Sequence, residues 1–185
     1  MQTAQRQDGQ FDALYRAHFD AISRYCLRRL PVEDARDATT EVFETAWKKL
    51  DATTDQDELL PWLYGVAHNV VRNRSRAARR RLRLLTQLTN QPTAHAADSA
   101  DQVLLSERGR SVQEAMGRLS ESDQEILGLR AYEDLTIHQI SLVLECSVDA
   151  AKKRSSRALQ RLKTEVENID AVHAAPRAER KEGTS

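Results

Sequence analysis

The stretch LTIHQISLVLECSVDAAKKRSSRALQRLKTEV, residues 135–166, decides how this chain folds. Thr136 is followed three residues later by Gln139, which is a capping-box pattern for the start of a helix. Ser147 suits the N-cap of a further helix. The pattern predicts two helices joined by a turn near residues 145–147, the second of them rich in Lys and Arg. This is the helix-turn-helix arrangement.

The second of these helices carries side chains that can read DNA. A helix fits the major groove of B-DNA, where Lys and Arg reach guanine edges and flanking phosphates. The predicted DNA-binding residues fall in its first three turns and are Lys152, Lys153, Arg154, Ser156 and Arg157. Leu159 and Leu162 are expected to face inward. The alternative is a solvated basic helix in an ordinary bundle. The capping box and the spacing of Ile137, Ile140 and Leu144 favour the DNA motif.

Helical periodicity also precedes this stretch, without the alternation that is typical of strands. Apolar residues recur at three- and four-residue steps over residues 11–30 and 32–50 and again from Pro61 onward. Pro31 stops the first of these helices, and Pro61 suits a first helical position. The apolar stripe of the first helix comprises Phe11, Leu14, Tyr15, His18, Phe19, Ile22 and Cys26. We therefore expect an all-α chain.

The length and composition suit two small helical domains. The chain has 185 residues with only 6 Gly, 4 Pro and 5% aromatic residues, which disfavours a β-sandwich or barrel. The apolar period is lost over residues 84–109, which we interpret as a flexible linker. The predicted domains cover residues 11–83 and 110–167, and a disordered tail is expected over residues 168–185.

The charges of the chain are segregated along its length. The formal net charge is zero, which taken alone argues against a nucleic-acid partner. Residues 61–83, however, hold 7 Arg and no acid, and residues 152–163 hold 6 bases and no acid. Residues 1–60 hold 8 bases against 12 acids. Because the local field decides whether a polyanion is attracted, the two cationic blocks are the expected nucleic-acid surfaces.

The helix that begins near Pro61 combines residue types that suit unpaired nucleic acid. Trp62 and Tyr64 can stack on bases. Asn69 and Asn73 can hydrogen-bond to base edges, and the arginines that follow can neutralise phosphates. The structural alternative places Trp62 in the core and leaves the arginines to bind any nucleic acid. This helix taken alone leaves both interpretations open.

The second helix presents four carboxylates at three- and four-residue steps, so they share one surface: Asp34, Asp37, Glu41 and Glu44. No His, Cys or further carboxylate accompanies them with the spacing of metal ligands, so neither a metal site nor acid–base catalysis is expected. The face is either solvated without a function or docks onto a basic partner.

Other features that would predict an enzyme or a membrane protein are missing from the sequence. No histidine has the partners of a catalytic triad, and Cys26 and Cys146 lack the spacing of a zinc site. No apolar run approaches the ~20 residues of a membrane span, and the polar start MQTAQRQDGQ is not a signal peptide. We expect no catalytic residue, metal, cofactor or membrane insertion, and a cytoplasmic location.

Three motifs occur in a recognisable order. They are DARDATTEVF at 34–43 followed by Trp47, WLYGVAHNVVRNRSR at 62–76, and the helix-turn-helix at 135–162. In this order and spacing the chain resembles the extracytoplasmic-function (ECF) group of sigma factors, and GVAHNVVRN is most similar to actinobacterial members. The departures from the family pattern include Thr40 for Gln, Asn73 for Asp, Asp149 for Gly and Ala150-Ala151 for Thr-Val.

The resemblance implies a sigma region 2-like helical bundle and a region 4-like helix-turn-helix domain, joined by the linker. It implies binding to core RNA polymerase through Asp34, Asp37 and Glu41. It implies recognition of the promoter −35 element by the basic helix, and capture of the melted −10 element by Trp62, Asn69, Arg72, Asn73 and Arg76. An anti-sigma factor is a further candidate partner. The alternative function is a helix-turn-helix transcription factor, or an interaction module, that acts without core polymerase.

Overall fold

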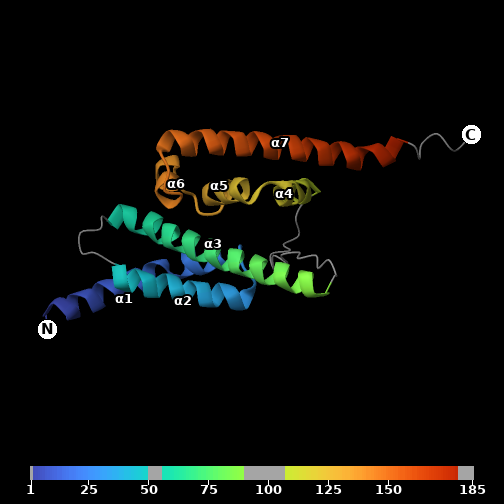
Figure 1. The fold of residues 1–185 in the computed structure, drawn as a ribbon. Coiled ribbons are helices and arrows are strands. Elements are labelled where there is room, and N and C mark those ends of the chain that lie inside the picture. The colour runs from blue at the N-terminus through green and yellow to red at the C-terminus, as the bar shows by residue number, and fades with distance from the viewer. Residues whose placement is uncertain (1, 50–55, 90–106, 179–185) are drawn as a thin grey trace, which may run out of the picture. The chain divides into compact units, whose positions relative to one another are not determined.

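The computed structural model describes residues 2–49, 56–89 and 107–178, and over these ranges the regular structure is seven helices and no strand (Figure 1). The predicted all-α class is confirmed. The chain divides into two compact units. We call α1, α2 and α3 the first unit, and α4, α5, α7 and most of α6 the second unit. No helix within the described ranges is long and apolar enough to cross a membrane.

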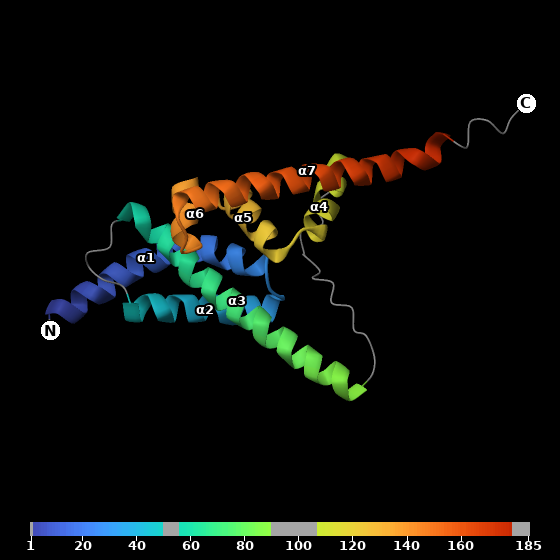
Figure 2. The ribbon, with the colours of Figure 1, turned by 45° about the horizontal axis from the view of Figure 1, so that its top comes forward.

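The first unit is a bundle of α1 (Gln2–Leu27), α2 (Val32–Lys49) and α3 (Gln56–Thr89), each packed against the other two (Figure 2). Its core combines large residues from α1 and α3 with three buried alanines of α2, which let the helices approach closely. The fully or nearly buried residues include Ile22, Tyr25, Ala35, Ala38, Val42, Ala46, Leu63 and Ala67. Partial burial lowers the pKa of His18 on α1, because burial disfavours the charged imidazole.

Two helix starts differ from the sequence prediction. Helix α1 begins at Gln2 rather than Phe11, and α3 begins at Gln56, which places Pro61 inside the helix. Proline lacks the N–H that would donate to residue 57, but this position lies near the helix start, so only one intrahelical hydrogen bond is lost. Burial of the Pro61 ring in the core offsets that loss.

Two helix ends lie beyond the predicted domain boundaries. Helix α3 continues to Thr89, into the predicted linker, and α7 continues to Ala178, into the predicted disordered tail. The segment at 84–89 is rich in Leu and the segment at 168–178 in Ala, two residue types with high helix propensity, and Ile169 of α7 is also buried in the core of the second unit. The rest of the predicted linker and tail, at 90–106 and 179–185, lies outside the described residues.

The second unit packs α4 (Glu107–Arg118) and α5 (Glu121–Ala131) against α7 (Val148–Ala178), with α6 (Ile137–Val143) preceding α7. Its core includes Ala115, Ile126, Leu129, Ile140, Ala151, Ala158 and Ile169. Ser120 caps α5 by accepting from the Asp123 N–H at 3.2 Å. The Asp123 carboxylate accepts from Arg161 at 2.7 Å with only 9% of its side chain exposed, which ties α5 to α7.

Candidate functional site

The turn between α6 and α7 has the geometry that the sequence predicted. The Thr136 N–H donates to Gln139 Oε1 at 2.9 Å, and the Gln139 N–H donates to Thr136 Oγ1 at 3.3 Å, so the capping box is confirmed. Glu145 adopts a left-handed backbone conformation (φ 50°), the conformation that commonly ends a helix. Ser147 then caps α7 by accepting from the Ala150 N–H at 3.2 Å. The start of α7 is therefore fixed by local hydrogen bonds.

The first turns of α7 expose one basic face. Lys152, Lys153, Ser156 and Arg157 are exposed and, with Asp149, line one hollow on the surface. The remaining predicted residue, Arg154, is half-buried on the flank of this face. The structure thus brings four of the five predicted DNA-binding side chains together on the exposed side of the helix.

The inward side of α7 differs from the prediction. Ala151, Ser155 and Ala158 are buried, whereas Leu159 is 55% exposed and Leu162 is half-buried. The buried residues are spaced by four and then three positions, from Ala151 to Ser155 to Ala158. The next residue, Leu159, therefore lies outside this buried stripe. The expectation that Leu159 faces inward is therefore wrong.

Helix α3 places its five predicted residues along one side. Trp62 is half-buried, and the four polar residues are exposed: Asn69, Arg72, Asn73 and Arg76. Steps of seven, four and three residues separate Trp62, Asn69, Asn73 and Arg76, which aligns them along the helix. Tyr64 belongs to the core instead, where its ring lies 5.4 Å from that of Tyr25.

The carboxylates of α2 are exposed, as predicted, but two of them have a partner within the first unit. Arg74 of α3 donates through Nε and Nη2 to Glu41 Oε2 at 3.1 and 2.9 Å. Its Nη1 also lies 3.8 Å from Asp37 Oδ2. The sequence alone did not predict this cluster, because Arg74 lies more than 30 residues from Asp37 and Glu41 and meets them only when α2 packs against α3.

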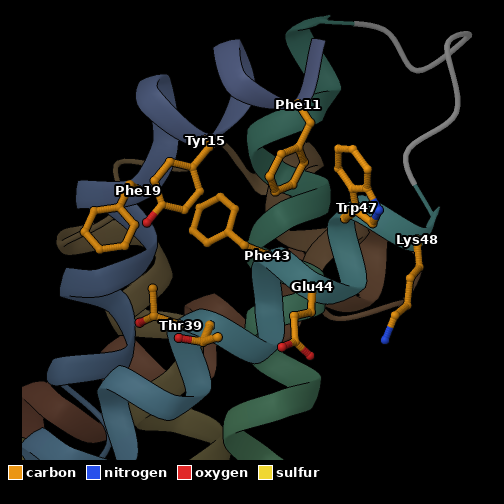
Figure 3. Close-up of a pocket in the computed structure, with 9 residues that line it drawn as sticks. Phe11, Tyr15, Phe19, Thr39, Phe43, Glu44, Trp47 and Lys48 are labelled. Carbon is orange, nitrogen blue, oxygen red and sulfur yellow. The ribbon is translucent and has the colours of Figure 1, made fainter. Parts of the chain in front are cut away.

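An aromatic groove between α1 and α2 was also missed. Figure 3 shows Phe11, Tyr15 and Phe19 of α1 facing Phe43 and Trp47 of α2. Phe43 is buried at the floor, with its ring 4.8 Å from that of Tyr15, while Phe11 and Trp47 meet edge to face at 4.9 Å. Tyr15, Phe19 and Trp47 keep 37–39% of their surface exposed, so the predicted apolar stripe of α1 is only partly covered.

This groove borders the acidic face of α2. Glu44 belongs to both surfaces, because it is one of the four exposed carboxylates and also lines the groove with Thr39, Thr40 and Lys48. Exposed aromatic rings rimmed by charged side chains are typical of protein-binding surfaces. The outer side of α2 therefore offers a combined apolar and acidic surface, whereas the polar side of α3 and the start of α7 are basic.

Comparisons with known proteins agree with this arrangement. The family model of Sigma-70 region 2 matches residues 14–81, and that of Sigma-70 region 4 matches residues 109–162. The ECF RNA polymerase sigma factor SigK of Mycobacterium sp. (strain KMS) is 29% identical over 168 residues, which cover 88% of this chain and 86% of SigK. The probable RNA polymerase sigma factor RfaY of Xanthomonas campestris pv. campestris is 32% identical over 139 residues, 73% of this chain but only 34% of RfaY.

Two solved structures share the fold. The sigma factor RpoE from Bartonella quintana, solved in complex with the anti-sigma factor NepR, aligns with a TM-score of 0.59 at 18% identity, over 85% of this chain and 97% of RpoE. CnrH, solved in complex with the cytosolic domain of CnrY, aligns with a TM-score of 0.59 at 21% identity, over 89% of this chain and 94% of CnrH. With both sigma regions matched in order, the chain belongs to the sigma-70 family, in its extracytoplasmic-function group, whose members are promoter-recognising subunits of RNA polymerase and not enzymes.

Proposed function

We propose that the two units of this sigma factor divide promoter recognition, with the second unit binding the duplex −35 element and the first unit capturing the melted −10 element. The observation that carries this proposal is the exposed basic face on the first turns of α7, directly after the capped turn. A helix presented in this way can enter the major groove with its N-terminal residues against the base edges. Lys152, Lys153, Ser156 and Arg157 are the proposed contacts, and Arg154 supports them from the flank.

The proposed −10 surface is the polar side of α3. Unpaired bases stack on aromatic rings, and amide side chains hydrogen-bond to their edges. The half-exposed Trp62 supplies the ring, Asn69 and Asn73 supply the amides, and Arg72 and Arg76 supply charge for the phosphates. The proposed domains are residues 11–83 and 110–167. Helix α3 continues past residue 83, and α7 continues past residue 167.

The proposed polymerase-binding surface is the outer side of α2. Asp34, Asp37 and Glu41 are exposed and would meet a basic surface of the core enzyme, while the aromatic groove beside them would take apolar side chains. This combination suits a partner helix that is both apolar and basic. Arg74 holds Glu41 in place, so a docking cation would share this carboxylate with Arg74.

The remaining assignments follow from family membership. We propose that the chain acts in the cytoplasm, has no catalytic activity of its own and uses no cofactor. An anti-sigma factor is proposed as a further partner, on the support of the structural neighbour RpoE, which was solved with the anti-sigma factor NepR.

Changing Trp62 and Asn69 to Ala tests the strand-capture surface. Loss of stacking on one unpaired base costs about 1–3 kcal/mol, so promoter opening should slow by about five- to 150-fold, whereas duplex binding by the holoenzyme should change little. Opening is measured by the reactivity of unpaired thymines to permanganate, and binding by filter retention. A template that is already melted over the −10 element should restore the rate.

Trp47 supplies the matched control, because it is a second half-exposed tryptophan of the same unit and lies in the groove of α2. At saturating core enzyme, the Trp47→Ala protein should open promoters at the normal rate. If Trp62→Ala opens promoters normally too, or if the pre-melted template fails to rescue it, the assignment of α3 to strand capture is wrong.

A further inference from the structure

An acidic residue occupies the basic DNA-facing side of α7. Asp149 lines the same hollow as Lys152, Lys153, Ser156 and Arg157 and is exposed at its N-terminal end. The other residues of the first helical turn, Val148, Ala150 and Ala151, are apolar. Asp149 is therefore the only side chain of that turn that can hydrogen-bond to a base, and it sits where helix-turn-helix proteins contact base edges.

Asp149 is not used for capping or ion pairing in the second unit. Ser147 already accepts from the N–H of Ala150, which is the hydrogen bond that a capping side chain would make. Lys152 and Lys153 follow at three and four residues, the spacing of helical ion pairs. Even so, among the described residues no hydrogen bond or ion pair engages the Asp149 carboxylate. The carboxylate is free to accept from a ligand.

The chemistry of the major groove limits what this ligand can be. A carboxylate is repelled by phosphates, so Asp149 would weaken rather than strengthen contacts to the DNA backbone. Of the base edges, guanine offers only acceptors and thymine an acceptor and a methyl group, while adenine places an acceptor next to its amino donor. Cytosine alone offers a donor, N4, without an adjacent acceptor.

We propose that Asp149 is a specificity-determining residue that selects cytosine at one position of the upstream duplex element. The guanine paired with that cytosine presents O6 and N7 acceptors, and Lys152, one turn further along α7, is the side chain placed to donate to them. A carboxylate and an ammonium group on adjacent turns would thus read both bases of one C·G pair. This inference rests on the proposed role of α7 in binding the −35 element.

The test is the selection of binding sites from duplexes with a randomised −35 region, by the full chain assembled with core polymerase. The wild-type protein should prefer cytosine at one position by about tenfold, within the 1–3 kcal/mol range of a mismatched base pair. Asp149→Ala should reduce this preference to about twofold or less and leave the other positions unchanged. Asp149→Asn should shift the preference to adenine, because an amide pairs with adenine N6 and N7.

Asp170→Asn is the matched control, since it removes an exposed carboxylate near the other end of α7 and should leave every preference unchanged. If Asp149 serves only the helix dipole, both of its variants will lower the thermal stability and leave the preference for cytosine unchanged, which would overturn the proposal. An unchanged preference in Asp149→Asn would overturn it as well. A wild-type holoenzyme that selects no upstream sequence would instead contradict the proposed function of α7.

Discussion

Changing Lys152, Lys153 and Arg157 together to Ala should lower the affinity of the holoenzyme for the upstream duplex by about 3 kcal/mol or more, which is over a hundredfold in Kd. The three side chains project from the exposed face of α7, while the buried face that holds the helix in the second unit, at Ala151, Ser155 and Ala158, is untouched. The loss should therefore be a loss of contacts, with helicity and thermal stability retained. Binding is measured on a duplex that carries only the upstream element.

Single variants separate the kinds of contact. A side chain that binds a base edge should relax preference at one position when it is replaced by Ala, and one that binds only phosphate should weaken all sequences alike and flatten the salt dependence. Lys163→Ala is the control, because Lys163 lies on the same helix about three turns beyond Lys152 and makes an ion pair with Glu167 at 4.0 Å. If the Lys163→Ala variant weakens binding as much as the triple variant does, then α7 attracts DNA by its general charge and not through its first turns.

Reversing Asp37 and Glu41 to Lys should weaken binding to core polymerase by about 3 kcal/mol, roughly a hundredfold. Each reversal replaces an attraction with a repulsion on a surface that adjoins the aromatic groove, where contact with a partner would exclude water. The fold should survive, because both residues are exposed and an exposed ion pair such as that with Arg74 contributes about 1 kcal/mol or less. Affinity is measured by fluorescence with labelled core enzyme, and helicity by circular dichroism.

The control for this pair is Glu167→Lys with Asp170→Lys, which changes the net charge equally on an exposed part of α7 in the second unit. It should bind core enzyme normally. Equal weakening by both pairs would show that overall charge, and not the surface of α2, determines the affinity. Loss of helicity in the Asp37 and Glu41 variant would mean that the Arg74 cluster is chiefly structural.

The sequence predicted the features that depend on neighbouring residues. The capping box at Thr136 and Gln139, the cap at Ser147 and the exposed carboxylates of α2 all follow from residue types at spacings of three or four. The position of Leu159 was predicted wrongly, because Leu159 and the adjacent Ala158 both suit an inward position and only the packing of α7 decides between them.

Features formed by separate helices could not be predicted in this way. The contact of Arg74 with Glu41 and the groove between Phe19 and Phe43 arise only when α2 packs against α3 and α1. Likewise, the loss of apolar period near residue 84 marks where a buried face ends, but not where the helix ends, since α3 continues to Thr89. Hydrophobic periodicity reports burial, and helix length also depends on intrinsic propensity.

Promoter recognition by this protein is tested most directly by transcription by core RNA polymerase with the purified full chain on genomic DNA, followed by mapping of the RNA 5′ ends. We expect discrete start sites that are absent with core enzyme alone and that share an upstream element and a −10 element. Initiation at those sites should be lost with the Lys152, Lys153 and Arg157 variant. A pattern of start sites that is the same with and without the chain would contradict promoter recognition by this protein.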